Sequence, residues 1–244
     1  MKTVCVGICG FPKKRELIFK NLDGVEIQET FYRLIKEDKI IRLKNEVPPG
    51  FIFTMKANQI ITHCSTSPTY RRSALPEDFC KENLGFFKPT KEVRLAYQHS
   101  LHLAKLLSAR ALIFQCPPSF KPTEDNLRNL QTFFREANRE RPPKLFFGLE
   151  LRAEWPQELI KKVCKDFDLI HVVDPFRENS LAGKIHYFRL HGRGKYSYRY
   201  SEEELQELWQ KIRQLPGKDC LLFFNNTFMY ENALQMKEII SQRF

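Results

Sequence analysis

The chain has 244 residues, of which 42% are hydrophobic and 21 are Phe, so it can bury a large core. No stretch approaches the roughly 20 apolar residues of a membrane-spanning helix, which excludes a helical integral membrane protein. The net charge of +11 favours an anionic partner, either a small molecule or nucleic acid, although solvated helix faces rich in Lys and Arg explain the charge equally well.

Residues 1–10 carry one Lys and a short apolar run with no cleavage site after it, which predicts a strand rather than a secretion signal. The seven cysteines form no C-x-x-C pair of the zinc or redox kind. We therefore expect reduced, mostly buried cysteines in a soluble cytoplasmic protein.

Eight runs of apolar, β-branched or aromatic residues have the length of strands. They lie at 3–9, 24–32, 51–57, 111–117, 145–152, 169–175, 185–191 and 220–226. Helical patterns separate most of them, at 92–109, 123–139, 156–167, 201–214 and 230–242. Ser201 and Glu204 form a capping box before one helix, and Thr123 can cap another.

Alternating strands and helices favour parallel pairing, and eight such strands close into a (β/α)₈ barrel in about 250 residues. We therefore predict one domain of this TIM type over residues 1–244. Two connections depart from the regular spacing. Residues 58–91 are a long insertion after the third strand, and 176–184 is too short for a crossover helix.

In this fold the polar side chains at the carboxyl ends of the strands form the working site. Because side chains alternate along a strand, the sequence predicts a polar ring there. Its members are Glu26, Gln28, Thr30, Tyr32, Thr54, Lys56, Gln115, Glu150, Arg152, Asp174, Tyr187, Arg189, His191, Asn225 and Asn226. The alternative is an internal layer of salt bridges without chemistry, such as Glu26 with Lys56 or Glu150 with Arg152.

The ring divides into two kinds of group. Lys56, Arg152 and Arg189 can hold an anion, with bidentate geometry from the guanidinium groups. The candidate general acids and bases are Glu26, Glu150, Asp174 and His191. Glu150, Asp174 and His191 are also the candidate ligands for a divalent metal such as Mg²⁺ or Mn²⁺, with neighbouring cations as competitors.

The segment after the seventh strand interleaves basic residues with tyrosines over 193–200. Such a segment can contact phosphates and stack on bases, or it can be an ordinary loop that packs on the barrel rim. Gly7 to Gly10 lack the spacing of a dinucleotide or P-loop fingerprint, so no nucleotide cofactor is indicated. Cys9 is expected to pack as a small residue rather than to act as a nucleophile.

Taken together, these motifs resemble the YecE-like family, a TIM-barrel family catalogued as domain of unknown function seventy-two. The resemblance rests on Val-Gly-Ile-Cys-Gly at 6–10, Val-Glu-Ile-Gln-Glu-Thr-Phe-Tyr at 25–32, Phe-Thr-Met-Lys-Ala at 53–57, Ile-Thr-His at 61–63, Phe-Gln-Cys-Pro-Pro at 114–118, Leu-Glu-Leu-Arg at 149–152, Arg-Leu-His-Gly at 189–192 and Phe-Phe-Asn-Asn at 223–226. It implies that Thr30, Tyr32, His63, Gln115 and Asn226 also serve the site. It assigns no reaction.

Three functions stay open at this point. The first is an enzyme for an anionic, phosphate-bearing substrate, with hydrolysis of a phosphodiester in nucleic acid as its natural form by analogy with other barrels. The second is a nucleic-acid-binding protein without catalysis. The third is metal-free isomerisation or hydrolysis of a sugar or sugar phosphate by Glu150 with Asp174 or Glu26. The sequence favours no particular oligomeric state.

Overall fold

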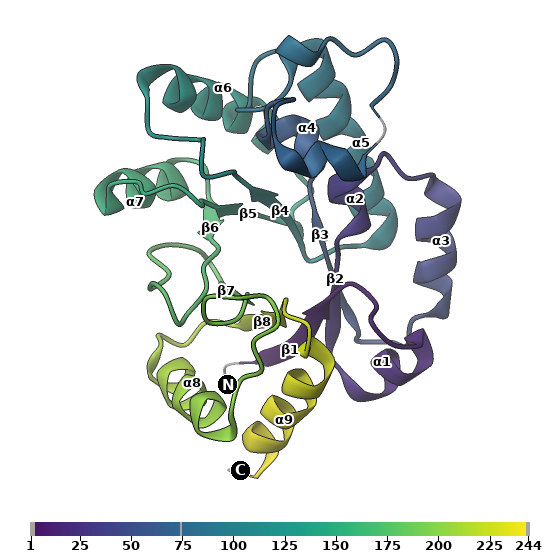
Figure 1. The fold of residues 1–244 in the computed structure, drawn as a ribbon, viewed down its shortest axis with the longest axis vertical. Helices are drawn as coiled ribbons and strands as arrows, with labels where there is room; N and C mark the ends of the chain where they lie inside the picture. Colours follow the sequence, from purple (N-terminus) through teal and green to yellow (C-terminus); the bar gives the residue numbers. More distant parts are fainter. Residues whose placement is uncertain (1–2, 74, 243–244) are drawn as a thin grey trace.

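A computed structural model describes residues 3–73 and 75–242, and these residues form eight parallel strands ringed by helices (Figure 1). The strands are β1 (Val4–Cys9), β2 (Gly24–Ile27), β3 (Ile52–Lys56), β4 (Ala111–Gln115), β5 (Phe146–Glu150), β6 (Leu169–His171), β7 (His186–Leu190) and β8 (Cys220–Phe224). The helices are α1 (Arg15–Asn21), α2 (Glu29–Tyr32), α3 (Glu37–Glu46), α4 (Gln59–Thr62), α5 (Lys91–Leu107), α6 (Glu124–Glu140), α7 (Gln157–Asp166), α8 (Glu202–Gln214) and α9 (Met229–Ser241).

The strands follow one another round a barrel in chain order. Strand β1 pairs with both β2 and β8, and each later strand pairs with its neighbour up to β6 on one side and β7 on the other. The ring closes through a parallel bridge between Val173 and Phe188, where the Arg189 N–H donates to the Val173 carbonyl over 2.9 Å. The predicted (β/α)₈ barrel is therefore confirmed.

Two apolar layers stabilise the barrel. A large core lies between the strands and the helices, and it includes buried Phe114, Phe134 and Phe147. A smaller cluster fills the interior of the barrel with residues that include Ile113 and Val172. Since the interior is packed with apolar side chains below, the polar side chains collect above them, towards the carboxyl ends of the strands.

Two predicted strands were too long, and one of them, the sixth run at 169–175, forms a strand only over Leu169–His171. The second run, at 24–32, forms a strand only as far as Ile27, and Glu29–Tyr32 is a short helical turn. Consequently Glu26 points into the barrel, whereas Thr30 and Tyr32 do not lie with it on one strand face. The Thr30 hydroxyl donates instead to the Lys56 carbonyl over 2.7 Å, which ties α2 to the end of β3.

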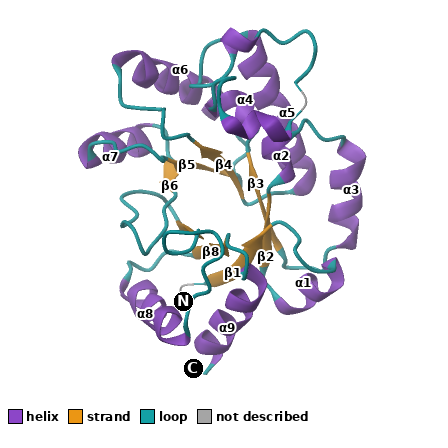
Figure 2. Ribbon diagram, in the orientation of Figure 1, coloured by secondary structure: helices purple, strands orange, loops and turns teal. Residues whose placement is uncertain are grey.

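The two irregular connections have the predicted positions. After β3, the insertion folds back on α4, because the N–H groups of Gly85 and Phe87 donate to the carbonyls of Ile60 and Ile61. Gly85 has a φ of +81°, and an added Cβ would lie 2.3 Å from the backbone of His63. Between β6 and β7 no helix forms within the fully described residues 172–185, which run as a loop (Figure 2).

Several local predictions hold as well. Ser201 and Glu204 form the capping box of α8, and the Thr123 side chain accepts from the Asn126 N–H at the start of α6. Among residues 3–73 and 75–242, we find no helix that combines the length and the apolar character needed to cross a bilayer.

Candidate functional site

The centre of the polar ring is Arg189 on β7, whose side chain is fully buried. Its Nη1 donates to Glu150 on β5 and, over 3.0 Å, to the Gln115 amide oxygen on β4. Its Nη2 donates to Glu26 Oε1 on β2 over 2.8 Å. Burial would lower the pKa of Arg189, but Glu150 and Glu26 hold it well above its usual value. One guanidinium therefore joins four strands and stays charged.

The Glu26 side of this network faces the barrel interior. The Tyr187 hydroxyl donates to Glu26 Oε2 over 2.6 Å and lies 2.7 Å from Thr54 Oγ1. Gln28 donates to the other carboxylate oxygen from above. Both oxygens of the buried Glu26 carboxylate are held by protein groups. Glu26 therefore serves here as an internal counter-ion for Arg189. For this pair, the structure agrees with the salt-bridge alternative.

The Glu150 side faces the mouth of the barrel. Glu150 Oε1 lies 2.6 Å from Arg152 Nη2 and 3.2 Å from His191 Nε2. Burial would raise the pKa of Glu150, but Arg189 and Arg152 hold it well below its usual value. Arg152 is 25% exposed, unlike Arg189, and within the described residues its side-chain hydrogen bonds all involve Nη2. Its Nε and Nη1 make no hydrogen bond within the described residues.

Both ring nitrogens of His191 contact polar side chains of the ring. Its Nε2 is 2.7 Å from Arg152 Nη2 as well as 3.2 Å from Glu150, and its Nδ1 is 3.1 Å from the Asn225 side-chain amide. Burial lowers the pKa of His191 despite the opposing charge of Glu150. A neutral ring can accept from Arg152 at Nε2 or donate to Glu150 from Nε2. The imidazole can therefore hold its proton on either nitrogen.

Lys56 lies at the carboxyl end of β3 and is 4% exposed. Its Nζ is 3.6 Å from the centre of the Phe31 ring. Burial, reinforced by the positive charge of Arg189, lowers the pKa of Lys56 to about 7. The predicted pairing of Glu26 with Lys56 does not form, because Arg189 takes that carboxylate.

Two predicted residues bind groups of the loops and of α9 rather than the side chains around Arg189. Asp174 accepts from the N–H groups of Phe176 and His191, over 3.0 and 3.1 Å, so it joins the ends of β6 and β7. Asn226 donates to the Tyr198 carbonyl over 2.7 Å and to Asn232 on α9 over 3.1 Å. Both side chains lie at the predicted end of the barrel, in positions that order the loops.

His63 and Tyr32 lie next to Lys56 rather than next to Glu150. Both rings make edge contacts with Phe31, at centroid distances of 5.0 and 4.9 Å respectively. His63 is 3% exposed, its Nδ1 lies 2.8 Å from Thr62 Oγ1, and burial lowers its pKa to about 3. Together with Lys56 they form a second group of predicted residues on the α2 and α4 side of the mouth.

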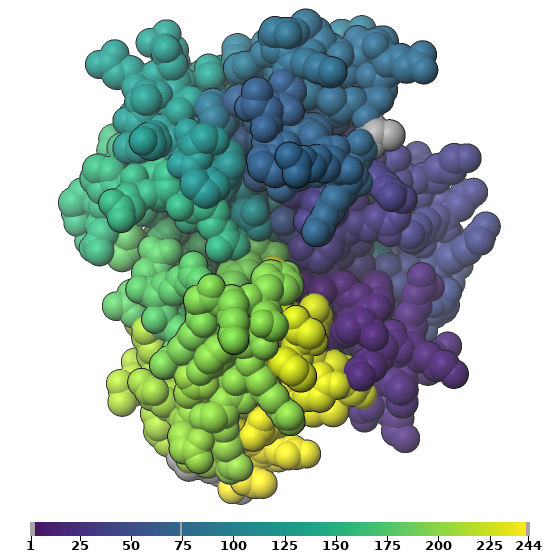
Figure 3. All heavy atoms as spheres, viewed as in Figure 1, coloured from purple at the N-terminus to yellow at the C-terminus, as the bar shows by residue number. Residues whose placement is uncertain are grey.

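The segment after β7 is more ordered than its composition indicates. Tyr200 is buried and its hydroxyl accepts from the Gly192 N–H over 2.8 Å, while Tyr198 and Arg193 both bind Glu204. Tyr196 is 54% exposed and donates to Asn225. In the view of Figure 3, this segment, in green, lies in the lower half of the molecule, and the insertion after β3, in blue, lies in the upper half.

A divalent metal does not fit the candidate ligands. Both oxygens of Glu150 are held by guanidinium groups, and Asp174 is held by two N–H groups. In the described part of the chain, no three His, Cys, Asp or Glu side chains come together as a metal-binding group. The cations of Arg152 and Arg189 occupy the places around Glu150 that a metal ion would take.

Cys9 contacts the network without joining its chemistry. Its Sγ lies 3.6 Å from Glu26 Oε1. Burial and the Glu26 charge raise the pKa of this thiol well above its usual value, although Arg189 opposes them. A thiol that stays protonated is a poor nucleophile, which agrees with the predicted packing role.

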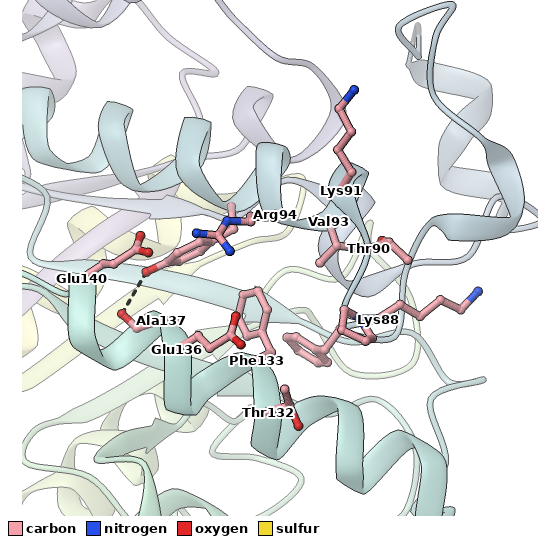
Figure 4. A pocket seen from close by; sticks show the side chains of 13 residues that line it. Lys88, Thr90, Lys91, Val93, Arg94, Thr132, Phe133, Glu136, Ala137 and Glu140 are labelled. Carbon is pink, nitrogen blue, oxygen red and sulfur yellow. Dashed lines mark hydrogen bonds between the residues drawn. The ribbon is translucent and has the colours of Figure 1, made fainter.

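A cavity of about 250 Å³ lies away from the barrel mouth, between α5 and α6 (Figure 4). Phe133 and Val93 line it together with Arg94, Glu136 and Glu140. The Tyr97 hydroxyl at its edge donates to the Ala137 carbonyl over 2.9 Å. None of the polar ring reaches it, so the ring and this cavity are separate features.

The sequence placed Tyr187 and Asn225 in the polar ring without predicting their partners, and it left Tyr196 out of the ring. Tyr187 was placed on the same strand face as Arg189, yet its contact with Glu26 depends on strands far apart in the chain. Asn225 contributes through its contact with His191, and Tyr196 contributes by donating to Asn225. The alternation along β7 was the signal for Tyr187, and for Tyr196 the signal was its place among the tyrosines of the segment 193–200.

Comparison with known proteins gives a consistent result for the whole chain. The sequence model of a family described as protein of unknown function DUF72 matches residues 13–243. A DUF72 family protein from Enterococcus faecalis V583 is 19% identical with a TM-score of 0.72, covering 99% of this chain and 97% of its own. A DUF72 family protein from Thermotoga maritima MSB8 is 22% identical with a TM-score of 0.70, covering 98% of this chain and 99% of its own.

A D-psicose 3-epimerase is 12% identical with a TM-score of 0.52, covering 99% of this chain and 98% of its own. No curated protein matches the chain. Identities this low show a shared fold alone. The resemblance noted from the sequence motifs is confirmed by the family match and by the two structures.

Proposed function

Because this chain belongs to the family of proteins of unknown function DUF72, whose description names no reaction, we propose its function from the site itself. The chain is an enzyme that binds a phosphate-bearing substrate at the carboxyl end of its barrel and moves protons there without a metal. The observation that carries this proposal is the position of His191, between Glu150 at 3.2 Å and Arg152 at 2.7 Å.

Arg152 supplies the anion-binding element of the proposal. Its Nη2 is used within the protein, whereas its Nε and Nη1 have no partner among the described residues and the side chain is 25% exposed. A guanidinium edge matches the geometry of a phosphate or carboxylate, and the net charge of +11 attracts such groups at long range. Arg189 cannot fill this role, because it is fully buried and held by two carboxylates.

His191 and Glu150 supply the proton chemistry. A neutral imidazole can accept a proton from a substrate carbon or hydroxyl, and the Glu150 charge stabilises the imidazolium that results. Asn225 orients the ring from its other nitrogen. Burial, with smaller contributions from the charges of Arg189 and Arg152, lowers the pKa of His191 and keeps the resting ring neutral, which leaves it competent as a base.

This chemistry supports a sugar phosphate or a similar small molecule more than a phosphodiester in nucleic acid. Barrels that cleave nucleic acid with metal ions use more histidine and carboxylate ligands than this ring offers, and the residues here do not fit a metal. A barrel with similar topology is described as a D-psicose 3-epimerase, although that likeness speaks for the fold alone.

Two measurements test the proposal. Binding of inorganic phosphate and of a panel of sugar phosphates is measured by calorimetry, and exchange of substrate C–H for deuterium in D₂O is followed by NMR. We expect Arg152→Gln to weaken binding about tenfold, the loss of one charged hydrogen-bonding partner. We expect His191→Gln to keep binding and to slow exchange by about 100-fold. Lys195→Gln, which removes an exposed charge from the nearby loop, is the matched control.

The proposal is rejected if Lys195→Gln weakens phosphate binding as much as Arg152→Gln does, or if exchange is unaffected by His191→Gln. Salt-sensitive binding of short DNA that depends on Lys195 and Arg199 but not on Arg152 would instead support the non-catalytic nucleic-acid-binding function.

A further inference from the structure

Lys56 is a buried amine to which the network around Arg189 gives no partner. Within the described residues its Nζ makes no hydrogen bond and no ion pair, and it lies over the face of Phe31, 3.6 Å from the ring centre. Its side chain is nevertheless 4% exposed and lies at the mouth of the barrel. Burial of a charged amine without a carboxylate partner is costly, so a lysine at such a position needs an explanation.

Lys56 is not needed as a counter-ion for the buried carboxylates. The two buried carboxylates, Glu26 and Glu150, are already paired with the guanidinium groups of Arg189 and Arg152. A charge on Lys56 would therefore be in excess at this end of the barrel. An apolar side chain of similar length, such as Met, would pack against Phe31 without that cost.

The groups that face Lys56 come from several elements. Arg189 and Arg152 repel its charge, Glu26 and Glu150 attract it, and His63 lies on the other side, where Lys56 in turn lowers the pKa of that ring. With a pKa of about 7, about half of this amine is neutral at pH 7, compared with roughly one part in 2,500 for an exposed lysine. A neutral amine is a nucleophile.

We propose that Lys56 forms an imine with an aldehyde or ketone carbonyl of the substrate. That the substrate carries a carbonyl group is inferred from Lys56 alone. That the same substrate carries a phosphate rests on the function proposed above. The nitrogen lone pair forms a bond to the carbonyl carbon, and the carbonyl oxygen leaves as water with the two protons of the amine. The imine then acidifies the neighbouring C–H bond, and His191 accepts that proton.

His191 then returns the proton to carbon, which regenerates the imine and leaves the imidazole neutral again. The product is released by the reverse of the first step: water adds to the imine carbon, the C–N bond breaks, the water oxygen becomes the carbonyl oxygen, and the amine regains its two protons. The cycle therefore needs no oxidant or reductant. This sequence explains why a neutral amine, a neutral imidazole and an open guanidinium edge lie at the same end of one barrel.

Reductive trapping tests the inference on the full chain. The protein is incubated at pH 7 with glyceraldehyde 3-phosphate, or with glyceraldehyde, in the presence of sodium cyanoborohydride, and the modified lysines are identified by peptide mapping. We expect Lys56 to be modified about 100-fold faster than any exposed lysine. Lys56→Arg and Lys56→Met should remove the fast phase, while Lys195→Met, on the exposed loop, should leave it intact.

Equal modification of Lys56 and the exposed lysines in the wild-type chain would overturn the inference, and that result needs no variant to fold. Fast trapping of both aldehydes with no advantage for the phosphate-bearing one would uphold the imine and reject the phosphate site. Phosphate binding that depends on Arg152, without fast trapping at Lys56, would reject the imine alone.

Discussion

Arg189 and Glu150 form an ion pair that is closed off from solvent, with side-chain exposures of 0% and 5%. The pair joins β7 to β5 across the interior of the barrel, and Glu26 binds the same guanidinium from β2. Strands that are distant in the chain are thus held at their carboxyl ends by one charged group. The same group sets the pKa of Glu150 and lowers that of Lys56.

Removal of the Arg189 charge should therefore destabilise the barrel. Arg189→Met leaves Glu26 and Glu150 buried without their shared partner, and we expect the free energy of unfolding to fall by about 3–5 kcal/mol. Arg128→Met is the control, because its ion pair with Asp125 is 70% and 82% exposed and should contribute about 0–1 kcal/mol. Urea titration measures both. Similar losses in the two variants would contradict the prediction.

The sequence was sufficient to predict the barrel and most of the ring, for a physical reason. In a closed barrel, alternation along each strand decides which side chains enter the interior, and the positions of Glu26, Glu150 and Arg189 follow from it. The polar residues could therefore be assigned to one end of the molecule before their contacts were known.

The partners within the ring could not be predicted in the same way. Glu26 was matched with Lys56 on the neighbouring strand, but Arg189 reaches it from across the barrel. Likewise, nothing in the sequence indicates that backbone N–H groups of two loops take both oxygens of Asp174. The turn at Glu29–Tyr32 contains aromatic and β-branched residues, which favour a strand until the fold ends it.

Stability should decline as the pH falls from 6.5 because two histidines are buried as neutral rings. Burial lowers the pKa of His63 to about 3 and that of His171 to about 4, against 6.5 for the unfolded chain. The unfolded state therefore takes up these protons first, and the loss continues down to about pH 4 for His171 and about pH 3 for His63. At pH 5 it amounts to roughly 2 kcal/mol for each histidine.

Unfolding at a series of pH values checks this window. The double variant His63→Gln and His171→Gln should show a flatter profile between pH 6.5 and 4 than the wild-type chain. His102→Gln is the control, since its side chain is 49% exposed. A wild-type profile that is already flat over this range would show that the two rings can be protonated in the folded state.

Asn232 on α9 should control the order of the segment after β7. Its Oδ1 accepts from the Tyr200 N–H over 3.3 Å, its Nδ2 donates to the Tyr200 carbonyl over 3.0 Å, and Asn226 donates to it. Asn232→Leu leaves these buried backbone groups unpaired, at a cost of about 1–3 kcal/mol. We expect trypsin to cleave after Lys195 and Arg199 several times faster, by an opening of the segment that precedes global unfolding.

The matched change is Asn138→Leu on α6, which removes one hydrogen bond to the Phe167 carbonyl far from this segment. Cleavage after Lys195 and Arg199 should keep its wild-type rate in that variant. If both variants accelerate cleavage equally, proteolysis follows general unfolding and Asn232 has no local role. If Asn232→Leu alone does so, the contacts of one asparagine on the last helix hold in place the loop that carries Tyr196 to Asn225, and through Asn225 they orient His191.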